Sequence, residues 1–172
     1  MAGFKLRKQY RLPKYNYANA GYYFVTICTK DRLHLFGEIN NGAMVLSSLG
    51  KITHEYWLQI PIHAPYAKCD TFIVMPNHVH GIILIEHSAE EILNDDKILR
   101  PQKHSLSMVV RNFKSAVTTH VRKFSSGINV WQSRFYDRIV RNERELIAIR
   151  KYIEDNPLQW EVDKNKEENL LM

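Results

Sequence analysis

The sequence contains few cysteines and no long hydrophobic run. Its longest apolar stretch ends at Glu86 and is shorter than the roughly 20 residues of a membrane-spanning helix, so we expect no membrane partner. The basic N-terminus lacks the apolar stretch of a secretory signal, which favours a cytoplasmic protein. The two cysteines, Cys28 and Cys69, are far apart and have no metal-ligand spacing. They are therefore expected to be small core side chains in a reduced compartment.

Positive charge exceeds negative charge. The net charge is +6 and the pI is about 9.3, values that favour a polyanionic partner. Between residues 100 and 150, eleven Lys and Arg accompany only three acids. Residues 4–15 mix basic and aromatic side chains, a combination that suits single strands, where phosphates need charge and bases need stacking surfaces. A solvated basic surface with a flexible arm explains the charge equally well.

The hydrophobic patterns predict one α+β domain. Its 172 residues, 45% of them apolar, are typical of a single globular core. We predict strands at residues 22–29, 71–75, 78–85 and 130–140, and helices at 46–60, 106–124 and 142–156. This order is that of a split βαβ, ferredoxin-like antiparallel sheet packed by helices, with an extra C-terminal helix. The predicted division is a basic arm at 1–17, the domain at 18–160 and a polar tail at 161–172.

His78 and His80 are the most informative residues for function, because they stand in a strand-forming apolar run. Side chains two apart on a strand point to the same face, so both imidazoles should converge on one spot. Buried polar groups are costly without partners. The pair therefore favours a metal ion or a phosphate at that spot, with a structural hydrogen-bonded pair as the alternative.

Tyr152 and Asn156 are four residues apart on the last predicted helix and share one face. A tyrosine hydroxyl is a poor nucleophile at its ordinary pKa of about 10, but a nearby metal or base can activate it. With a metal on the histidines, Tyr152 could attack a phosphodiester and Asn156 could donate an oxygen ligand. The simpler alternatives are a core-edge tyrosine and a helix stop before Pro157.

Taken together, these residues resemble a known family. Five ordered segments resemble the single-tyrosine HUH transposases, and within them the REP-associated tyrosine transposases of bacteria: Gly21–Thr29, Met75–Gly81, Trp131–Gln132, Tyr136–Asn142 and Tyr152–Pro157. The resemblance covers roughly residues 10 to 160, and the ordered set is far more specific than any one motif. The residue between the histidines is Val79, which only has to pack on the opposite face of the strand.

The resemblance implies an HUH-endonuclease type of ferredoxin-like fold and cleavage of single-stranded DNA beside a hairpin or palindromic repeat. It assigns metal ligation to His78, His80 and Asn156, with Mg²⁺ or Mn²⁺ as the expected ion. The nucleophile falls on Tyr152, which would remain joined to the DNA as a 5′-phosphotyrosine, while the released 3′-hydroxyl could later rejoin strands. Such a protein would act as a monomer or homodimer in the bacterial cytoplasm, associated with the nucleoid when bound to DNA.

Seven basic residues are predicted to hold the DNA backbone, although on a basic amphipathic helix a lysine is often simply solvated. They are Lys5, Arg7, Lys8, Arg11 and Lys14 of the arm, and Arg111 and Lys114 of the helix at 106–124.

Two other classes of function compete with a nuclease. A domesticated descendant could bind single strands or hairpins without cutting them, but the intact set of His78, His80, Tyr152 and Asn156 argues against loss of chemistry. An RNA-binding ferredoxin-like domain would display aromatic residues on its open sheet face. Here that face is predicted to carry two histidines instead.

Overall fold

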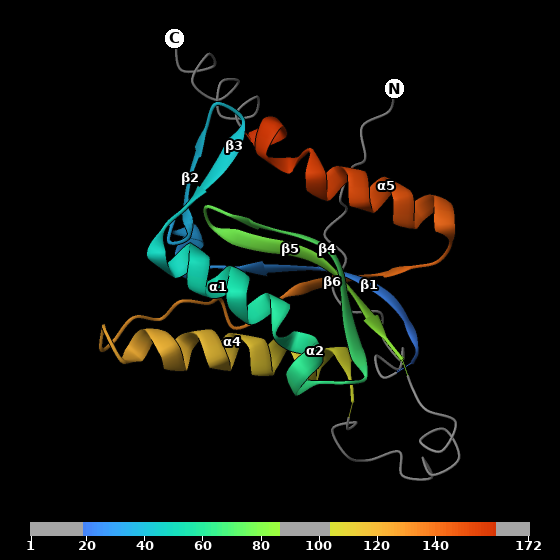
Figure 1. The fold of residues 1–172 in the computed structure, drawn as a ribbon, viewed down its shortest axis with the longest axis horizontal. Coiled ribbons are helices and arrows are strands. Elements are labelled where there is room, and N and C mark those ends of the chain that lie inside the picture. The colour runs from blue at the N-terminus through green and yellow to red at the C-terminus, as the bar shows by residue number, and fades with distance from the viewer. Residues whose placement is uncertain (1–18, 87–103, 161–172) are drawn as a thin grey trace.

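The computed structural model describes residues 19–86 and 104–160. The basic arm, residues 87–103 and the polar tail lie outside the described residues. Figure 1 shows a central sheet with helices on both of its faces. Within the described ranges, no helix combines the length and apolar character that crossing a membrane would need.

Four antiparallel strands form the main sheet, in the order β4-β5-β1-β6. They are β1 (Gly21–Cys28), β4 (Ala67–Met75), β5 (His78–Ile85) and β6 (Tyr136–Val140). β5 lies between β1 and β4 and is antiparallel to both, so β1 and β4 run parallel, as in a split βαβ unit. The predicted ferredoxin-like α+β class is confirmed, and the Pro76–Asn77 turn joins β4 to β5 as expected.

The helices divide between the two faces of the sheet. α1 (Ser48–Leu58), the short α2 (Ile60–His63) and α4 (Leu106–Arg122) lie on one face, and α5 (Glu143–Glu154) lies on the other (Figure 1). Three of them begin at side-chain caps, in which Ser47, Ser105 and Asn142 accept hydrogen bonds from the amides of Gly50, Met108 and Glu145. At α5 the Glu145 carboxylate also accepts a hydrogen bond from the amide of Arg141, one residue before the cap.

Besides α2, which continues past the predicted helix end at residue 60, a hairpin and a 3-10 turn were not predicted from the sequence. A hairpin of β2 (Gly37–Asn40) and β3 (Ala43–Leu46) precedes α1, and a 3-10 turn, η1 (Lys30–Arg32), follows β1. The hairpin turns at Asn41 and Gly42, whose φ angles of 50° and 72° fit the Asn-Gly pair of a primed turn. That pair was a readable signal.

The predicted strand at 130–140 is shorter than expected. Only Tyr136–Val140 forms a strand, and Trp131 makes a single bridge to Thr29. The cause is Lys114 of α4, whose ammonium group donates to the carbonyls of Gln132 (2.5 Å) and Ser133 (3.2 Å). Carbonyls that face a helix cannot extend the ladder of the sheet, so the chain crosses this region as a loop.

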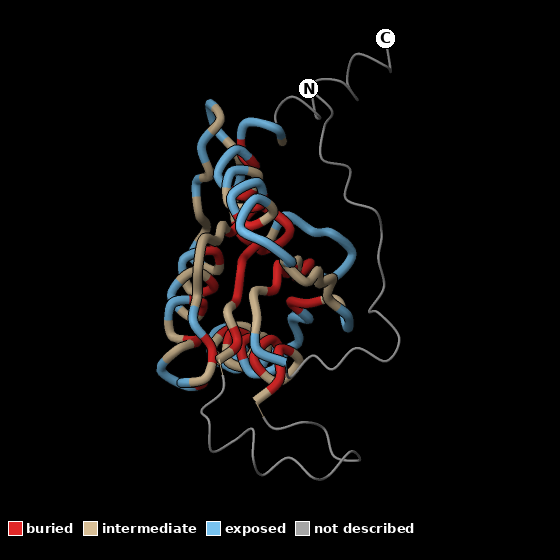
Figure 2. Tube along the Cα trace, turned by 90° about the vertical axis from the view of Figure 1, so that its right-hand side faces the viewer, coloured by how far each residue is buried: buried red, intermediate tan, exposed pale blue. Residues whose placement is uncertain are grey.

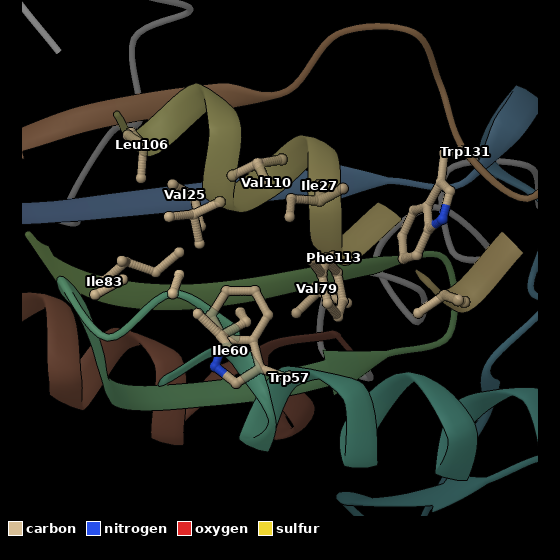
Figure 3. Close-up of a cluster of buried hydrophobic side chains, with 14 of the residues drawn as sticks. Val25, Ile27, Trp57, Ile60, Val79, Ile83, Leu106, Val110, Phe113 and Trp131 are labelled. Atoms are coloured by element: carbon tan, nitrogen blue, oxygen red, sulfur yellow. The ribbon is translucent and has the colours of Figure 1, made fainter. Parts of the chain in front are cut away.

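Each face of the sheet has its own core, visible as the buried centre of the molecule in Figure 2. Figure 3 shows the larger one, in which Trp57, Phe113 and Trp131 pack on strand residues such as Val79. The ring centroids of Trp57 and Phe113 are 5.2 Å apart, and those of Phe113 and Trp131 are 5.6 Å apart. The smaller core joins α5 to the sheet through the buried residues Phe24, Ile82, Leu146, Ile149 and Ile153. The buried residues of α4 and α5 thus lie along one side of each helix.

Gly81 allows the larger core to approach β5 directly beside the histidines. A Cβ at this position would lie 2.2 Å from Cζ2 of Trp57 and 2.7 Å from its Cη2. We expect Gly81→Ala to lower the free energy of unfolding by about 1–3 kcal/mol, because overpacking forces the indole out of place. Chemical denaturation would measure the change.

Trp57→Phe provides the control for this prediction, because phenylalanine lacks the outer part of the indole that causes the clash. The Gly81→Ala cost should be smaller in the Trp57→Phe background than in the parent chain. An unchanged denaturation midpoint for Gly81→Ala alone would contradict the tight contact.

Candidate active site

His78 and His80 lie side by side on the face of β5 that α5 covers. They alternate with Val79, which is fully buried in the core on the other face, as the strand pattern predicted. Both histidines are nearly inaccessible, with 6% and 5% of their surface exposed. Their ring centroids are 4.3 Å apart. The two imidazoles therefore converge on one buried spot.

Each imidazole is held at its Nδ1 atom by a neighbouring polar side chain. Nδ1 of His78 lies 2.8 Å from Oδ1 of Asn77, which can only accept, so Nδ1 of His78 carries the proton. Nδ1 of His80 lies 2.9 Å from Oγ1 of Thr26, its cross-strand partner in β1. Nε2 of His78 is buried and has no hydrogen-bond partner among the described residues. A buried, unpaired nitrogen lone pair is costly unless a ligand takes it up.

Burial keeps both rings neutral. It lowers the pKa of His78 to about 3, and the nearby charge of Arg32 acts in the same direction. Burial is also the largest cause that holds the pKa of His80 well below its ordinary value, and His78 and Arg32 lower it further. Neutral imidazoles are the form that binds metal ions.

Tyr152 of α5 reaches the histidine pair from the opposite layer. Its Oη atom lies 3.5 Å from Nε2 of His80, at the outer limit of hydrogen bonding. The tyrosine ring packs edge-on against Phe24, with centroids 6.1 Å apart. Tyr152 is half-buried and packs against the border of the smaller core.

Asn156 is buried, with 8% of its surface exposed, and begins the next helical turn, at residues 156–160. It stands midway along a stripe of residues four apart. Tyr152, at one end, contacts His80. Trp160, at the other, contacts His78 with ring centroids 5.8 Å apart. Helical residues at this spacing share a face, which puts Asn156 on the side of the helix that meets the histidine pair.

These groups could supply part of the coordination shell of a metal ion. Among the described residues, no three or more His, Cys, Asp or Glu side chains come together as a metal site. His78, His80 and the amide oxygen of Asn156 could supply three ligands, leaving water or phosphate oxygens for the rest. The unpaired Nε2 of His78 and the neutral state of both rings fit such an ion.

Tyr136 is a second tyrosine near this site. Thr26 pairs with His80 on one side and with Tyr136 on the other. Cross-strand partners share a face of the sheet, so Tyr136 stands on the same face as His80, two strands away. It remains the natural rival nucleophile, although the tyrosine whose hydroxyl reaches His80 is Tyr152.

The basic residues predicted to bind DNA are separated from this site or lie outside the described residues. Lys5, Arg7, Lys8, Arg11 and Lys14 belong to the arm. Arg111 is exposed on α4, across the sheet from α5. Lys114, on the same helix, is half-buried, and its ammonium group donates hydrogen bonds to the carbonyls of Gln132 and Ser133. Burial also lowers its pKa. Lys114 thus joins α4 to the segment at 132–133. Its contact with DNA stays a prediction.

A charged pair that was not foreseen joins α5 to the sheet edge. Nε and Nη2 of Arg150 donate to the two carboxylate oxygens of Asp70, at 2.9 Å and 2.7 Å. Asp70 lies where the register of β4 shifts, between Cys69 and Phe72. Such a bulge re-aims a side chain, and here it turns the carboxylate toward the helix two residues from Tyr152. Strand and helix patterns do not reveal a bulge, so no sequence signal indicated this pair.

Comparison with known proteins shows the family of this chain. No protein-family model matches the chain. An uncharacterized protein of Haemophilus influenzae is 41% identical over 170 residues, which cover 95% of this chain and 94% of that protein. The chain belongs to the same family as this Haemophilus influenzae protein. The two therefore share a fold over nearly their whole lengths.

A solved structure identifies the fold of this family. The REP-associated tyrosine transposase bound to a REP hairpin has a TM-score of 0.60 to this chain, with 19% sequence identity. The match covers 89% of this chain and 74% of the transposase. The family has the fold of a REP-associated tyrosine transposase, which confirms the fold implied by the sequence motifs.

The Asp70–Arg150 pair should stabilise the protein in a pH-dependent way. Its hydrogen bonds from Arg150 lower the pKa of Asp70 from 3.8 to about 2. The stabilisation is thus fully present above pH 3.8 and is lost as the pH falls through about 2. We expect Asp70→Asn to cost about 1–2 kcal/mol near neutral pH, an amount reduced for partial exposure, and the cost to shrink in acid.

Glu143→Gln is the matched control, since Glu143 lies 4.0 Å from the same arginine but is 72% exposed. Its denaturation midpoint should stay near that of the parent chain. Equal effects of Asp70→Asn and Glu143→Gln would show that the bidentate pair contributes no more to the free energy of unfolding than the exposed one.

Proposed function

We propose that this protein is a transposase: a metal-dependent endonuclease and strand transferase that cleaves single-stranded DNA near hairpins. The observation that carries the proposal is the approach of the Tyr152 hydroxyl to within 3.5 Å of His80. His80 is one of two buried, neutral imidazoles on one strand, and the other has an unpaired Nε2 atom. The shared fold adds support, because the solved transposase is described as bound to a REP hairpin.

The proposed ion is Mg²⁺ or Mn²⁺, held by His78, His80 and Asn156. When bound, it would polarise the phosphodiester and favour attack on the phosphorus. Asn77 and Thr26, at 2.8 Å and 2.9 Å from the Nδ1 atoms, fix the ring orientations, as hydrogen-bond partners of metal-binding histidines commonly do. Two neutral nitrogens and one amide oxygen would hold Mg²⁺ weakly, because that ion prefers charged oxygens and water.

Tyr152 would act as the nucleophile. Its Oη atom forms a bond to phosphorus as the phenol loses its proton, and the bond from phosphorus to the 3′ oxygen breaks. The 3′ oxygen gains a proton and leaves as a hydroxyl, while the 5′ side stays on the enzyme as a phosphotyrosine. Reversal of this step by another 3′-hydroxyl rejoins strands. No external energy source is required, since one phosphoester replaces another.

The proposed partner is single-stranded DNA that carries a hairpin or palindromic repeat. The arm residues Lys5 to Lys14 and Arg111 on α4 would neutralise phosphates outside the cleavage site. Because Arg111 and α5 lie on opposite faces of the sheet, one DNA molecule could reach both only by passing around an edge of the domain. Binding should then weaken steeply with salt, as counterion release requires.

Titration with Mn²⁺ tests the metal site directly. Isothermal calorimetry should detect one site in the parent protein, and His78→Ala should remove it because two of three protein ligands cannot retain a weakly held ion. His63→Ala is the control, since His63 is an exposed histidine of α2 outside the site. Unchanged binding in His78→Ala would remove the basis for the assignment.

Tyr152→Phe tests the nucleophile. With Mn²⁺ and a single-stranded hairpin substrate, the parent protein should form a protein–DNA adduct that survives a denaturing gel. Tyr152→Phe should lose the adduct but keep its DNA affinity within about twofold, because only one hydroxyl is removed.

Tyr136→Phe serves as the control, because Tyr136 shares the sheet face with His80. It should retain the adduct. An adduct that persists in Tyr152→Phe and disappears in Tyr136→Phe would reassign the nucleophile. DNA binding without any adduct in the parent protein would instead support the non-cleaving hairpin-binding alternative.

A further inference from the structure

The η1 turn beside the histidines has an unusual backbone. Asp31 and Arg32 have φ angles of 52° and 57°, in the left-handed region that residues with a side chain seldom adopt. Two such residues in succession cost free energy and persist only where their surroundings hold them. Strain of this kind concentrates at functional sites, so the side chains of this turn are candidates for a functional role.

Asn77 holds both this turn and a candidate metal ligand. Its Nδ2 atom donates to the carbonyl of Arg32 at 3.3 Å, and its Oδ1 atom accepts from Nδ1 of His78 at 2.8 Å. The Asn77 carbonyl accepts from the amide of Thr29 at 2.9 Å and from its hydroxyl at 3.0 Å. One side-chain amide thus fixes the Arg32 backbone relative to the His78 ring.

The turn carries one positive charge that no described partner neutralises. Lys30 and Asp31 neutralise each other through an ion pair of 2.9 Å. Arg32 is exposed, and its guanidinium makes no hydrogen bond or ion pair within the described residues. Its backbone is joined through the Asn77 side chain to the His78 ring, so this charge belongs to the surroundings of the histidine pair. Its contribution to the lowered pKa of His78 and of His80 agrees with that placement.

A guanidinium beside a divalent cation is unfavourable unless an anion lies between them. Coulomb repulsion between the two positive groups would weaken metal binding. A phosphodiester reverses the sign of this effect, because its non-bridging oxygens can face the metal and the guanidinium at the same time. The planar fork of arginine is suited to such oxygens.

We propose that Arg32 binds a non-bridging oxygen of the phosphodiester that Tyr152 attacks, and that Asn77 positions it for this contact. The proposal rests on the proposed function for the identity of the reacting phosphate. Arg32 is then a catalytic residue, because negative charge on the phosphate oxygens grows as the bond from Tyr152 to phosphorus forms. A donor aimed at those oxygens stabilises the transition state more than the ground state.

Two substitutions remove the charge in different ways. Arg32→Gln keeps most of the side-chain length, and Arg32→Gly suits the left-handed backbone. If the guanidinium matters, both should reduce the rate of adduct formation, on the order of 100-fold or more, as for removal of a donor to developing charge. Arg32→Lys should recover only part of the rate. Arg122→Ala, an exposed arginine at the end of α4, is the matched control and should react like the parent.

Binding to uncleaved DNA tests the contact without the chemistry. In the Tyr152→Phe background, Arg32→Gln should weaken binding of the single-stranded hairpin substrate about tenfold at low salt, and lower the salt dependence by about one phosphate contact. A substrate with a neutral methylphosphonate at the cleaved position should lose this difference, so that Tyr152→Phe binds it equally well with and without the Arg32→Gln substitution.

A methylphosphonate scan along the strand identifies which phosphate is involved. Loss of the Arg32→Gln effect at the cleaved position supports the proposal. Loss at another position, or an effect that persists at every position, overturns it. So does a rate for Arg32→Gln and Arg32→Gly equal to that of Arg122→Ala.

The outcomes also separate this proposal from the proposed function. If the parent protein forms no adduct, the proposed chemistry fails. A scan that still assigns Arg32 to one phosphate would then retain Arg32 as an anion-binding residue. If the parent forms the adduct and Arg32 variants do so at the same rate, only the Arg32 proposal fails.

Discussion

The burial of β5 on both faces is the constraint on which the rest of the structure depends. Seven of its eight residues are buried, so the side chains on each face must be packed or hydrogen-bonded by neighbouring elements. On one face Gly81 leaves room for Trp57. On the other, His78 and His80 must find partners for buried nitrogens. The hairpin turn supplies Asn77, and the neighbouring strand supplies Thr26. The strand is thus held in one register by packing on one side and by hydrogen bonds on the other.

Because the histidines are buried, the position of α5 determines what they can do. The helix is joined to the sheet at two separated strands: Arg150 binds Asp70 of β4, and Glu145 binds Arg138 of β6. Between these ion pairs, Leu146, Ile149 and Ile153 pack on Phe24 and Ile82. A helix tied to both edges of a sheet cannot easily rotate or slide. The approach of Tyr152 to His80 is therefore a consequence of several contacts along α5, and none of them involves the tyrosine hydroxyl itself.

The sequence was most informative where a periodic pattern meets a buried surface. The strand alternation around Val79 predicted that His78 and His80 share one face, and the helical spacing predicted that Tyr152 and Asn156 share another. It was less informative where backbone geometry departs from a period. The bulge at Asp70, the left-handed turn at Asp31 and Arg32 and the carbonyl contacts of Lys114 all depend on partners distant in the chain. The Asn41–Gly42 hairpin is different, because its turn signal is local in the sequence.

The chemistry of the site has an electrostatic consequence. Among the described residues, the charge of Arg32 lowers the pKa of both imidazoles and His78 also lowers that of His80, whereas no carboxylate is among the causes. Neutral nitrogens attract a divalent ion far less than carboxylates do, and an arginine opposes it. If the protein works as proposed, the negative charge that such an ion needs must come from the nucleic acid. Metal and DNA would then each strengthen the binding of the other, by the same factor. A site of this kind assembles fully only when its substrate is present, so the free protein would present a nucleophile next to an incomplete metal shell.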